Sequence, residues 1–281
     1  MKVKTKIGIV GCGAIGREVA LFIEKQLSNN VILWGLADKD AEKAELLAEA
    51  LTCAPRIVAA DALIKSVDLV IETASVEAAK YVIEKALIYN TDVLILSVGA
   101  LVEDASLLEK AKKKGINVYV PSGAICGVDG LGALSLGEIK KISLTTSKPP
   151  KGLIGARYLV EHKISLENLK EEKIVFKGTV KEAIKYFPQN INVAAILFLA
   201  SSFSGKKFGT KNGKPLVEVC IKADPHVERN IHRIEIDTEE SKVSITVENV
   251  PSKTNPKTSA LAVLSTQYLL KKLFSSFKIG S

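Results

Sequence analysis

Residues 5–27 read TKIGIVGCGAIGREVALFIEKQL, and this stretch decides the fold of the first half of the chain. The apolar run from Ile7 to Val10 predicts a buried strand, and glycines follow it at positions 11, 13 and 16. Apolar residues then recur at helical spacing as far as Leu27. We therefore expect a strand, a glycine-rich turn and a helix, in that order.

The GxGxxG spacing of this turn is typical of a loop that holds the pyrophosphate of a dinucleotide. Gly11 allows the tight turn, Gly13 lets the backbone approach the phosphates, and Gly16 lets the helix pack closely on the strand. The phosphates would meet free N–H groups at the start of the helix. The residues predicted to contact the coenzyme here are Gly11, Gly13, Ala14 and Ile15.

An acidic residue supports this interpretation, because the glycine spacing alone is weak evidence. The next predicted strand, VILWGLAD, ends in Asp38, which lies 22 residues after Gly16 (38 − 16). A carboxylate at about this distance accepts hydrogen bonds from the adenosine ribose of NAD. Lys39 beside it could pair with a 2′-phosphate, so the predicted coenzyme is NAD or NADP.

Strands and helices continue to alternate through the first half. Apolar strands are predicted at 66–75, 91–101 and 116–124, and helices at 76–90 and 103–115. This alternation predicts a parallel sheet covered on both faces, which is an α/β doubly wound (Rossmann) domain. Ligands of such sheets bind beyond the carboxyl ends of the strands. The small residues at these ends are either coenzyme contacts or simple turn residues: Ala74, Ser75, Ser97 and Gly99.

The composition argues against several classes of protein. The chain has 281 residues, of which 47% are hydrophobic and 25% charged, so we expect one large or two ordinary globular domains. No apolar run approaches the roughly 20 residues that span a bilayer, so we expect no membrane partner. The net charge is +8, but only 5% of residues are aromatic and the lysines are dispersed. This argues against nucleic-acid binding and suits small anionic ligands.

The cysteines indicate the compartment. Cys12, Cys53, Cys126 and Cys220 lie far apart, which excludes a zinc ribbon or a CxxC redox pair, and we expect no metal. Four scattered cysteines fit a reducing compartment. The first residues read as the start of a domain rather than as a signal peptide. We therefore expect a cytoplasmic protein.

The pattern changes after residue 130. Strands are predicted at 215–223, 231–237 and 242–249, after a nearly all-apolar helix that starts near Pro188. Strands that cluster together with flanking helices predict a second, α+β domain.

The last helix is predicted to begin with Asn255 as its N-cap and Pro256 in its first turn. We assign this helix, about 256–281, together with residues 1–122 to the dinucleotide-binding domain. Residues 123–255 then form the domain that binds substrate.

One histidine has an informative position. In NIHRIEID (230–237), alternation places His232 at the end of the strand on the face of the buried isoleucines. The same parity places Asn249 on a core face at the end of the following strand. A polar group at the rim of an apolar face is what a half-buried site needs, although a core histidine bonded to a carbonyl gives the same pattern. His162 and His226 have no such position.

Four segments of the second half, together with GIVGCGAIG near the amino terminus, closely resemble the L-aspartate dehydrogenase family. The segments are VPSGAICGVDGLGAL (120–134), FPQNINVAAILFLA (187–200), ADPHVERNIH (223–232) and VENVPSKTNPKTSALAVLS (247–265). The resemblance implies a Rossmann domain with a second domain like that of dihydrodipicolinate reductases, and a homodimer. It also implies oxidation of L-aspartate by NAD or NADP to iminoaspartate, which hydrolyses to oxaloacetate and ammonia or feeds pyridine-nucleotide biosynthesis.

The resemblance further implies roles for individual residues. His232 matches the family's catalytic histidine, and Ala124 and Asn190 match coenzyme contacts. The two carboxylates of aspartate need cationic and N–H partners, for which the candidates are Ser122, Gly123, Lys148, Asn249, Lys257 and Thr258. Two departures from the family are visible: the segment 204–220 is longer than is common, and Ser147 stands where a basic residue is expected.

Two other functions share the nucleotide-binding features. One is a different imine or aldehyde reductase on the same scaffold, which would not need the ERNIH and NPKTS segments. The other is a non-catalytic, NAD-responsive regulator, a class that usually adds a DNA-binding or partner-binding module. No segment of this sequence is left over to form such a module.

Overall fold

The computed structural model describes residues 3–187, 192–202, 210–211, 214–215, 217–250 and 259–280. The chain forms two compact units. The first consists of Met1–Pro121 with Val263–Ile279, and the second of Ser122–Ala262 with Gly280–Ser281.

The first unit is built on a parallel six-stranded sheet in the order β3-β2-β1-β4-β5-β6. Its strands are β1 (Thr5–Val10), β2 (Val31–Ala37), β3 (Arg56–Ile57), β4 (Leu69–Glu72), β5 (Asp92–Ile95) and β6 (Val118–Tyr119). Its helices are α1 (Ala14–Phe22), continued by the π-helical η1 (Ile23–Leu27), then α2 (Ala41–Glu49), α3 (Ala60–Ser66), α4 (Val76–Tyr89), α5 (Gly99–Glu103), α6 (Ser106–Lys114) and most of α11 (Ala260–Phe274). The strand order reverses between β1 and β4, which is where ligands of such sheets bind.

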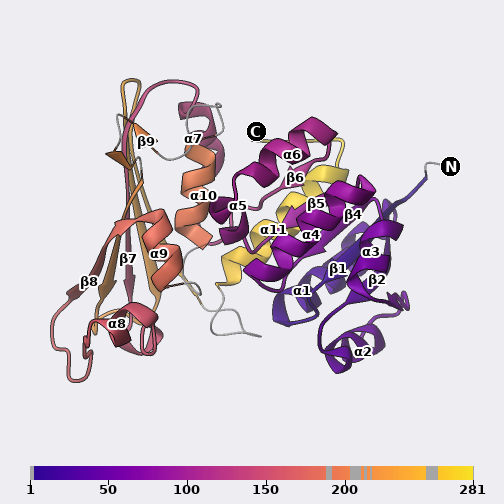
Figure 1. The fold of residues 1–281 in the computed structure, drawn as a ribbon, viewed down its shortest axis with the longest axis horizontal. Coiled ribbons are helices and arrows are strands. Elements are labelled where there is room, and N and C mark those ends of the chain that lie inside the picture. Colours follow the sequence, from indigo (N-terminus) through magenta and orange to yellow (C-terminus); the bar gives the residue numbers. More distant parts are fainter. Residues whose placement is uncertain are drawn as a thin grey trace. The chain divides into compact units, whose positions relative to one another are not determined.

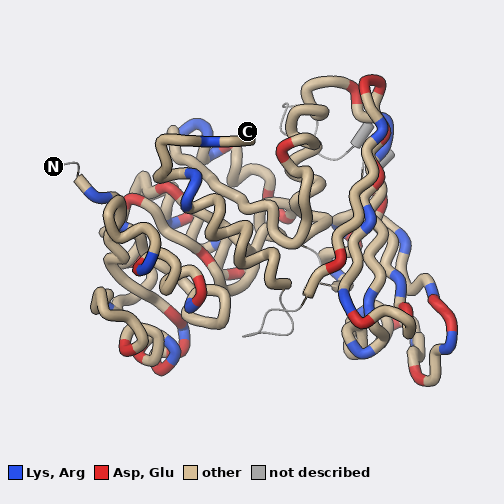
Figure 2. The backbone as a smooth tube through the Cα atoms, turned by 180° about the vertical axis from the view of Figure 1, so that it is seen from behind, with Lys and Arg blue, Asp and Glu red and all other residues tan. Residues whose placement is uncertain are grey.

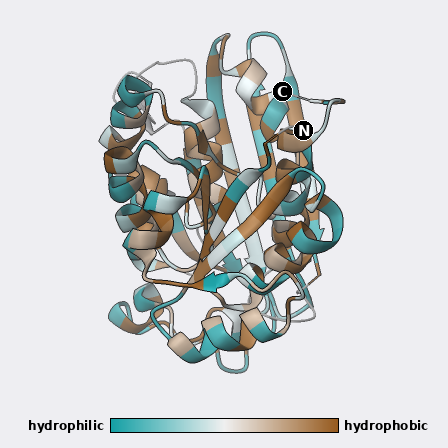
Figure 3. Ribbon diagram, turned by 90° about the vertical axis from the view of Figure 1, so that its right-hand side faces the viewer, coloured by the Kyte–Doolittle hydropathy of each residue, from teal (hydrophilic) through white to brown (hydrophobic). Residues whose placement is uncertain are grey.

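Apolar residues of this sheet form a continuous core. Ile7 and Ile9 of β1 are fully buried and pack in one cluster with Val19 of α1 and Leu270 of α11. Figure 3 shows the hydrophobic colouring of the strands of this unit beside helices that alternate between hydrophobic and hydrophilic residues. This is the pattern of a sheet covered by amphipathic helices. The last helix of the chain therefore belongs to the core of the first unit.

Three predicted strands of this unit are shorter than expected. The strand predicted at 66–75 is reduced to Leu69–Glu72, the residues that pair with Ile7–Val10 of β1. The prediction of a strand over 91–101 is wrong beyond Ile95, because the neighbouring β4 ends at Glu72 and the chain enters α5 at Gly99. The strand predicted at 116–124 is reduced to Val118–Tyr119, the residues that pair with Val93 and Leu94 of β5. Each of these strands covers only the residues that pair with a neighbouring strand, so pairing and not apolar character sets its length.

The second unit is built on a mixed five-stranded sheet in the order β13-β12-β7-β11-β8, with β9 and β10 as a separate pair. Its strands are β7 (Ile139–Lys148), β8 (Lys173–Thr179), β9 (Thr210–Lys211), β10 (Lys214–Pro215), β11 (Val217–Ala223), β12 (Asn230–Thr238) and β13 (Lys242–Asn249). Its helices are α7 (Val128–Leu134), the 3₁₀ turn η2 (Pro150–Gly152), α8 (Arg157–Glu161), α9 (Val180–Tyr186) and α10 (Asn192–Ser201). Among the described strands of this sheet, β7 and β11 pair in parallel and the other pairs are antiparallel.

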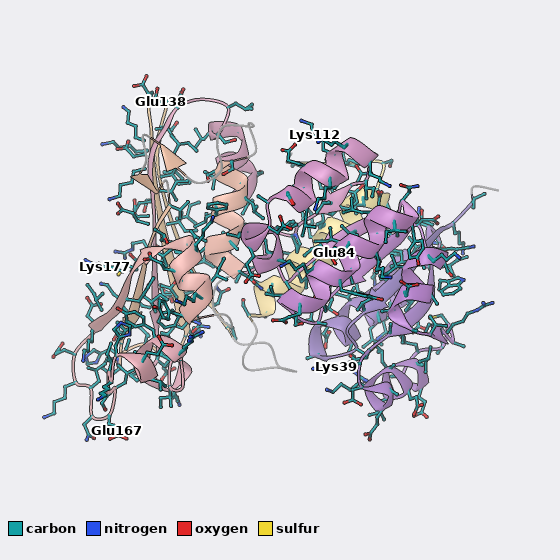
Figure 4. The ribbon with its side chains drawn as sticks, viewed as in Figure 1. Lys39, Glu84, Lys112, Glu138, Glu167 and Lys177 are labelled. Atoms are coloured by element: carbon teal, nitrogen blue, oxygen red, sulfur yellow. The ribbon has the colours of Figure 1, made fainter. Side chains whose placement is uncertain are left out.

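This sheet has one apolar and one polar face. Helices α9 and α10 lie along one face (Figure 1), and the residues of β12 that point to it, such as Ile234, are buried. The opposite face carries polar side chains such as Thr145 and Arg233, and Lys177 of β8 projects from it (Figure 4). Figure 2 shows positive and negative residues interleaved along these strands. The period-2 alternation of the sequence is therefore expressed directly in burial.

Of three predicted boundaries in this unit and the last helix, the structure corrects one, and two lie outside the described residues. The strand predicted at 215–223 begins at Val217 in β11, and Pro215 belongs to the short β10. The predicted helix start near Pro188 lies outside the described residues, and so does the predicted N-cap Asn255. Within the described residues, α10 begins at Asn192 and α11 at Ala260.

In the described part of the chain, every helix is too short or too polar to cross a bilayer. The same residues contain no group of three or more His, Cys, Asp or Glu side chains arranged to hold a metal ion.

Candidate functional site

The glycine-rich turn of the first unit has the conformation that its spacing predicts. Gly11 has φ +104°, in the region that favours glycine, and a Cβ there would lie 2.8 Å from the backbone of Thr73. A Cβ on Gly16 would collide with the Gly11 carbonyl oxygen. A Cβ on Gly13 would meet no atom within 4 Å, so this position is open. The turn therefore packs tightly against the protein at Gly11 and Gly16. At Gly13, which is predicted to face the pyrophosphate, it is open.

Asp38 lies directly beside this turn. Its Oδ2 accepts a hydrogen bond of 2.6 Å from the Cys12 N–H, and its Oδ1 accepts one of 2.9 Å from the Asp40 N–H. Burial and the charge of Asp38 raise the pKa of the Cys12 thiol to about 12, so this thiol stays protonated. Lys39, by contrast, projects from the surface (Figure 4). The carboxylate is therefore fixed next to the turn, as a ribose ligand would need to be.

Glu72, which no sequence pattern indicates, organises the same edge of the sheet. Its carboxylate is fully buried at the end of β4. It accepts hydrogen bonds from Ala74 N–H (2.6 Å), Ser97 Oγ–H (2.8 Å) and Ser97 N–H (2.9 Å). The neighbouring Thr73 hydroxyl donates to the Gly11 carbonyl over 2.6 Å. Side chains thus connect the loops that follow β1, β4 and β5.

The small residues predicted at this edge have different surroundings. Ala74 and Ser75 are exposed, and the Ser75 hydroxyl caps α4 by accepting a bond from the Ala78 N–H (3.2 Å). Gly99 is buried, and a Cβ there would lie 3.1 Å from Val76. Capping and close packing are structural roles. Of the two alternatives for Ser75 and Gly99, coenzyme contact or turn residue, these surroundings account for the second.

In the second unit, His232 lies on the apolar face of the sheet and is 5% exposed. It pairs in register with Thr146 of β7, and its Nδ1 lies 3.0 Å from the Thr146 Oγ1. Burial, followed by the charge of Lys148, lowers the pKa of His232 to about 4. The imidazole is therefore neutral at pH 7.

Lys148 ends β7, two residues after Thr146, so its side chain points to the same face as His232. It is 6% exposed, and burial lowers its pKa to about 8. A buried ammonium that loses its proton this easily is uncommon outside functional sites. An imidazole, a hydroxyl and an ammonium group thus gather at one end of the buried face.

Asn249 ends β13 at the same end of the sheet and is also buried. Its Nδ2 donates to the Ala124 carbonyl (2.9 Å), and its Oδ1 accepts from the Ser259 hydroxyl (2.7 Å). The amide thus joins three segments that are distant in sequence. Gly123, with φ +63°, sits where a Cβ would lie 2.9 Å from Ile196 of α10, and Ser122 precedes it half-buried.

Three predicted site residues lie outside the described residues: Asn190, Lys257 and Thr258. Of the others, the structure brings His232, Lys148 and Asn249 to one end of a sheet face, and it adds Thr146. Register alone relates Thr146 to His232 across 86 positions, so no local pattern could have indicated it.

The carboxyl edge of the first sheet and the end of the second sheet that carries His232 suit different chemistry. Open glycine backbone next to a fixed carboxylate fits the phosphates and ribose of a dinucleotide. A neutral imidazole beside a buried cation can accept a proton next to a bound anion. These are the parts required by a nicotinamide-dependent dehydrogenase whose substrate is an acid.

Comparison with known proteins agrees with this description. Residues 129–273 match the family described as aspartate dehydrogenase, C-terminal, and residues 11–121 match the homoserine dehydrogenase NAD binding domain. The L-aspartate dehydrogenase of Methanosarcina mazei is 43% identical over 280 residues, which cover 98% of this chain and 99% of that protein. The corresponding protein of Methanocaldococcus jannaschii is 40% identical over 280 residues, with the same shares.

A solved structure supports the same relationship. The crystal structure of aspartate dehydrogenase from Thermotoga maritima matches with a TM-score of 0.73 and 28% identity, over 99% of this chain and 100% of that one. The predicted α/β Rossmann fold class, the class of nicotinamide-dependent amino-acid dehydrogenase and the coenzyme, NAD or NADP, are confirmed. On the extent of these matches, the chain belongs to the L-aspartate dehydrogenase family.

Proposed function

We propose that this chain oxidises L-aspartate to iminoaspartate with NAD or NADP, after which water converts the imine to oxaloacetate and ammonia. The observation that carries the proposal is the pairing of His232 with Thr146 beside Lys148 on one sheet face. A neutral base and a buried cation suit a substrate that carries negative charge and must exchange protons.

The first unit is proposed as the coenzyme domain. Its residues that fit the coenzyme are the open backbone at Gly13, the start of α1 at Ala14 and Ile15, and the carboxylate of Asp38. When bound, the coenzyme supplies the acceptor for the hydride that leaves Cα of aspartate. We expect Asp38 to favour NAD through the ribose, with Lys39 allowing some use of NADP.

The second unit is proposed as the substrate domain, with His232 as its catalytic base. The Thr146 hydroxyl can accept from Nδ1–H, which selects the tautomer whose Nε2 lone pair is available. His232 would then take a proton from the water that attacks the imine carbon, and it would return a proton in the reverse direction. Thr146 acts only by holding the ring.

The carboxylates of aspartate are proposed to bind to Lys148 and to the N–H groups near Ser122 and Gly123. Asn249 supports this end of the sheet by fixing Ala124, whose own proposed role is a coenzyme contact. Lys257, Thr258 and Asn190, which the structure does not describe, complete the proposed set.

The proposal extends to the cellular setting. The iminoaspartate formed would feed either pyridine-nucleotide biosynthesis or hydrolysis. The active form is proposed to be a homodimer in the cytoplasm, with small molecules and no nucleic acid as ligands.

The test is an absorbance assay of reduced coenzyme with L-aspartate and, separately, NAD and NADP. We expect turnover of L-aspartate and little with other amino acids. Turnover of a different imine or aldehyde, with none of aspartate, would favour the other reductase. Coenzyme binding without turnover of any dicarboxylic amino acid would favour the regulator.

A further inference from the structure

Glu72 is a fully buried carboxylate that the proposed reaction does not use. Burial raises the pKa of its carboxyl group, although hydrogen bonds from Ser97 and Ala74 act in the opposite direction. A carboxylate is costly to bury unless several donors satisfy it. Such a group at a strand end therefore calls for an explanation beyond packing.

The bonds of Glu72 all go to two loops. Oε1 accepts from the Ala74 N–H (2.6 Å) in the loop after β4 and from the Ser97 hydroxyl (2.8 Å) in the loop after β5. Oε2 accepts from the Ser97 N–H (2.9 Å). One side chain thereby fixes both loops at the carboxyl edge of the sheet, which is where ligands of doubly wound sheets bind.

We propose that Glu72 is a positioning residue that sets the two loops carrying Ala74, Ser75 and Ser97 against the nicotinamide half of the coenzyme. Because its side chain is wholly enclosed, it acts through these loops and touches no ligand. The inference rests on the proposed coenzyme role of the loops. The adenine half depends on other parts, the glycine-rich turn and Asp38, which Glu72 does not contact in the bonds described above.

The opposite edge of the same sheet provides a matched comparison. Asp92 of β5 also accepts bonds across strands, from the Asn117 N–H (2.8 Å) and the Asn117 side-chain amide (2.9 Å). It lies at the amino end of its strand, whereas Glu72 lies at the carboxyl end of β4. Asp92 is half-buried rather than enclosed, so it serves as a control for the loss of a cross-strand carboxylate bond away from the carboxyl edge.

The variant Glu72→Gln has nearly the same shape but one acceptor oxygen fewer. Its amide nitrogen must face either the Ser97 N–H or the Ala74 N–H. Either the loop after β5 keeps only its Ser97 hydroxyl bond, or the loop after β4 loses its bond to residue 72. The experiment measures Kd by titration for two probes, NADH and ADP-ribose, which lacks the nicotinamide ring. In Glu72→Gln we expect Kd for NADH to rise about tenfold and Kd for ADP-ribose to stay within about twofold.

Controls and contrary outcomes separate this inference from the proposed function. Asp92→Asn should leave both affinities unchanged, and Ser97→Ala should weaken NADH about threefold with ADP-ribose unaffected. Equal weakening of both probes in Glu72→Gln, or no change in either, overturns the positioning role. If Glu72→Gln does not fold, as judged by circular dichroism, Ser97→Ala decides, and an unchanged Kd for NADH overturns it. Aspartate turnover by the wild-type chain tests the proposed function independently.

Discussion

The carboxyl edge of the first sheet differs in its construction from the end of the second sheet that carries His232, Thr146 and Lys148. The first is made of backbone N–H groups, glycines and carboxylates, and its key turn, Gly11–Gly13, lies directly between β1 and α1. The second is made of single side chains from three strands, with His232 and Thr146 separated by 86 positions. We infer that nucleotide binding is encoded locally, whereas the proposed catalytic group is encoded by strand pairing. This difference predicts that substitutions at the two ends will separate coenzyme binding from turnover.

The largest expected effect is at His232. In His232→Ala we expect turnover of aspartate to fall about 10²–10⁴-fold, because a positioned base is lost, while NADH affinity hardly changes. Single-turnover kinetics and a coenzyme titration measure the two quantities. His226→Ala, which changes an exposed histidine of the same unit, serves as the control. Near-normal turnover in His232→Ala would remove this residue from the catalytic role.

The next effect concerns Lys148. In Lys148→Met we expect KM for aspartate to rise roughly 100-fold, because a charge-assisted bond to a carboxylate is lost. Steady-state kinetics with varied aspartate measure this change, and the KM for coenzyme should stay the same. A rise in the coenzyme KM instead would place Lys148 in the nucleotide site.

The lowered pKa of Lys148 adds a pH dependence. The ammonium form is the one that attracts carboxylates, so kcat/KM for aspartate should fall as pH rises through about 8. In Lys148→Arg the guanidinium keeps its charge, so this alkaline limb should disappear. Since the charge of Lys148 also lowers the pKa of His232, Lys148→Met should move that pKa upward from about 4, as NMR titration of the ring would detect. A His232 pKa that does not move would contradict their proximity.

A smaller effect is expected at the nucleotide edge. In Asp38→Ala we expect NAD affinity to fall roughly 10- to 30-fold and the preference to shift toward NADP, because a ribose acceptor is lost. Kd values for both coenzymes measure this, with kcat at saturating coenzyme little changed. The matched control is Asp40→Ala, because the Asp40 side chain forms a surface ion pair with Lys43 (3.2 Å). An unchanged coenzyme preference would show that Asp38 is not the ribose ligand.

The smallest effect is expected at Thr146. Thr146→Val has the same shape but leaves Nδ1 of His232 without its hydroxyl partner, so we expect kcat to fall about tenfold with coenzyme affinity unchanged. Thr146→Ser restores the hydroxyl and should recover most of the activity. The pair of variants distinguishes loss of the bond from loss of packing. Equal defects in both variants would leave only a packing role.

Sequence reasoning succeeded where the information is local or periodic. The glycine spacing identified the turn at Gly11, and alternation along β12 placed His232 on the buried face, where it lies at 5% exposure. Alternation also placed Asn249 correctly on the core face. In each case one strand or one turn contains the whole signal.

Sequence reasoning failed for residues whose bonding partner is distant in the sequence, and for a polar residue that is buried against the pattern of its strand. The bond of Thr146 depends on the register of β7 with β12, which no single strand contains. Glu72 lies within the strand predicted at 66–75, and nothing in that pattern indicates that its carboxylate is wholly buried and bonded to two loops. The strand predicted to reach residue 101 ends at Ile95 because its pairing with β4 ends there, and pairing cannot be seen in one segment.

The position of α11 has a consequence for the synthesis of the chain. Leu270, near the carboxyl terminus, is fully buried in the cluster that contains Ile7 and Val19. Domains usually complete themselves in order as they leave the ribosome, the amino-terminal one first. Here the nucleotide unit starts first but cannot close its core until the final helix has emerged, after the whole second unit has been made. A nascent chain that stalls before α11 is synthesised would therefore expose apolar surface on the first unit, although that unit was synthesised first.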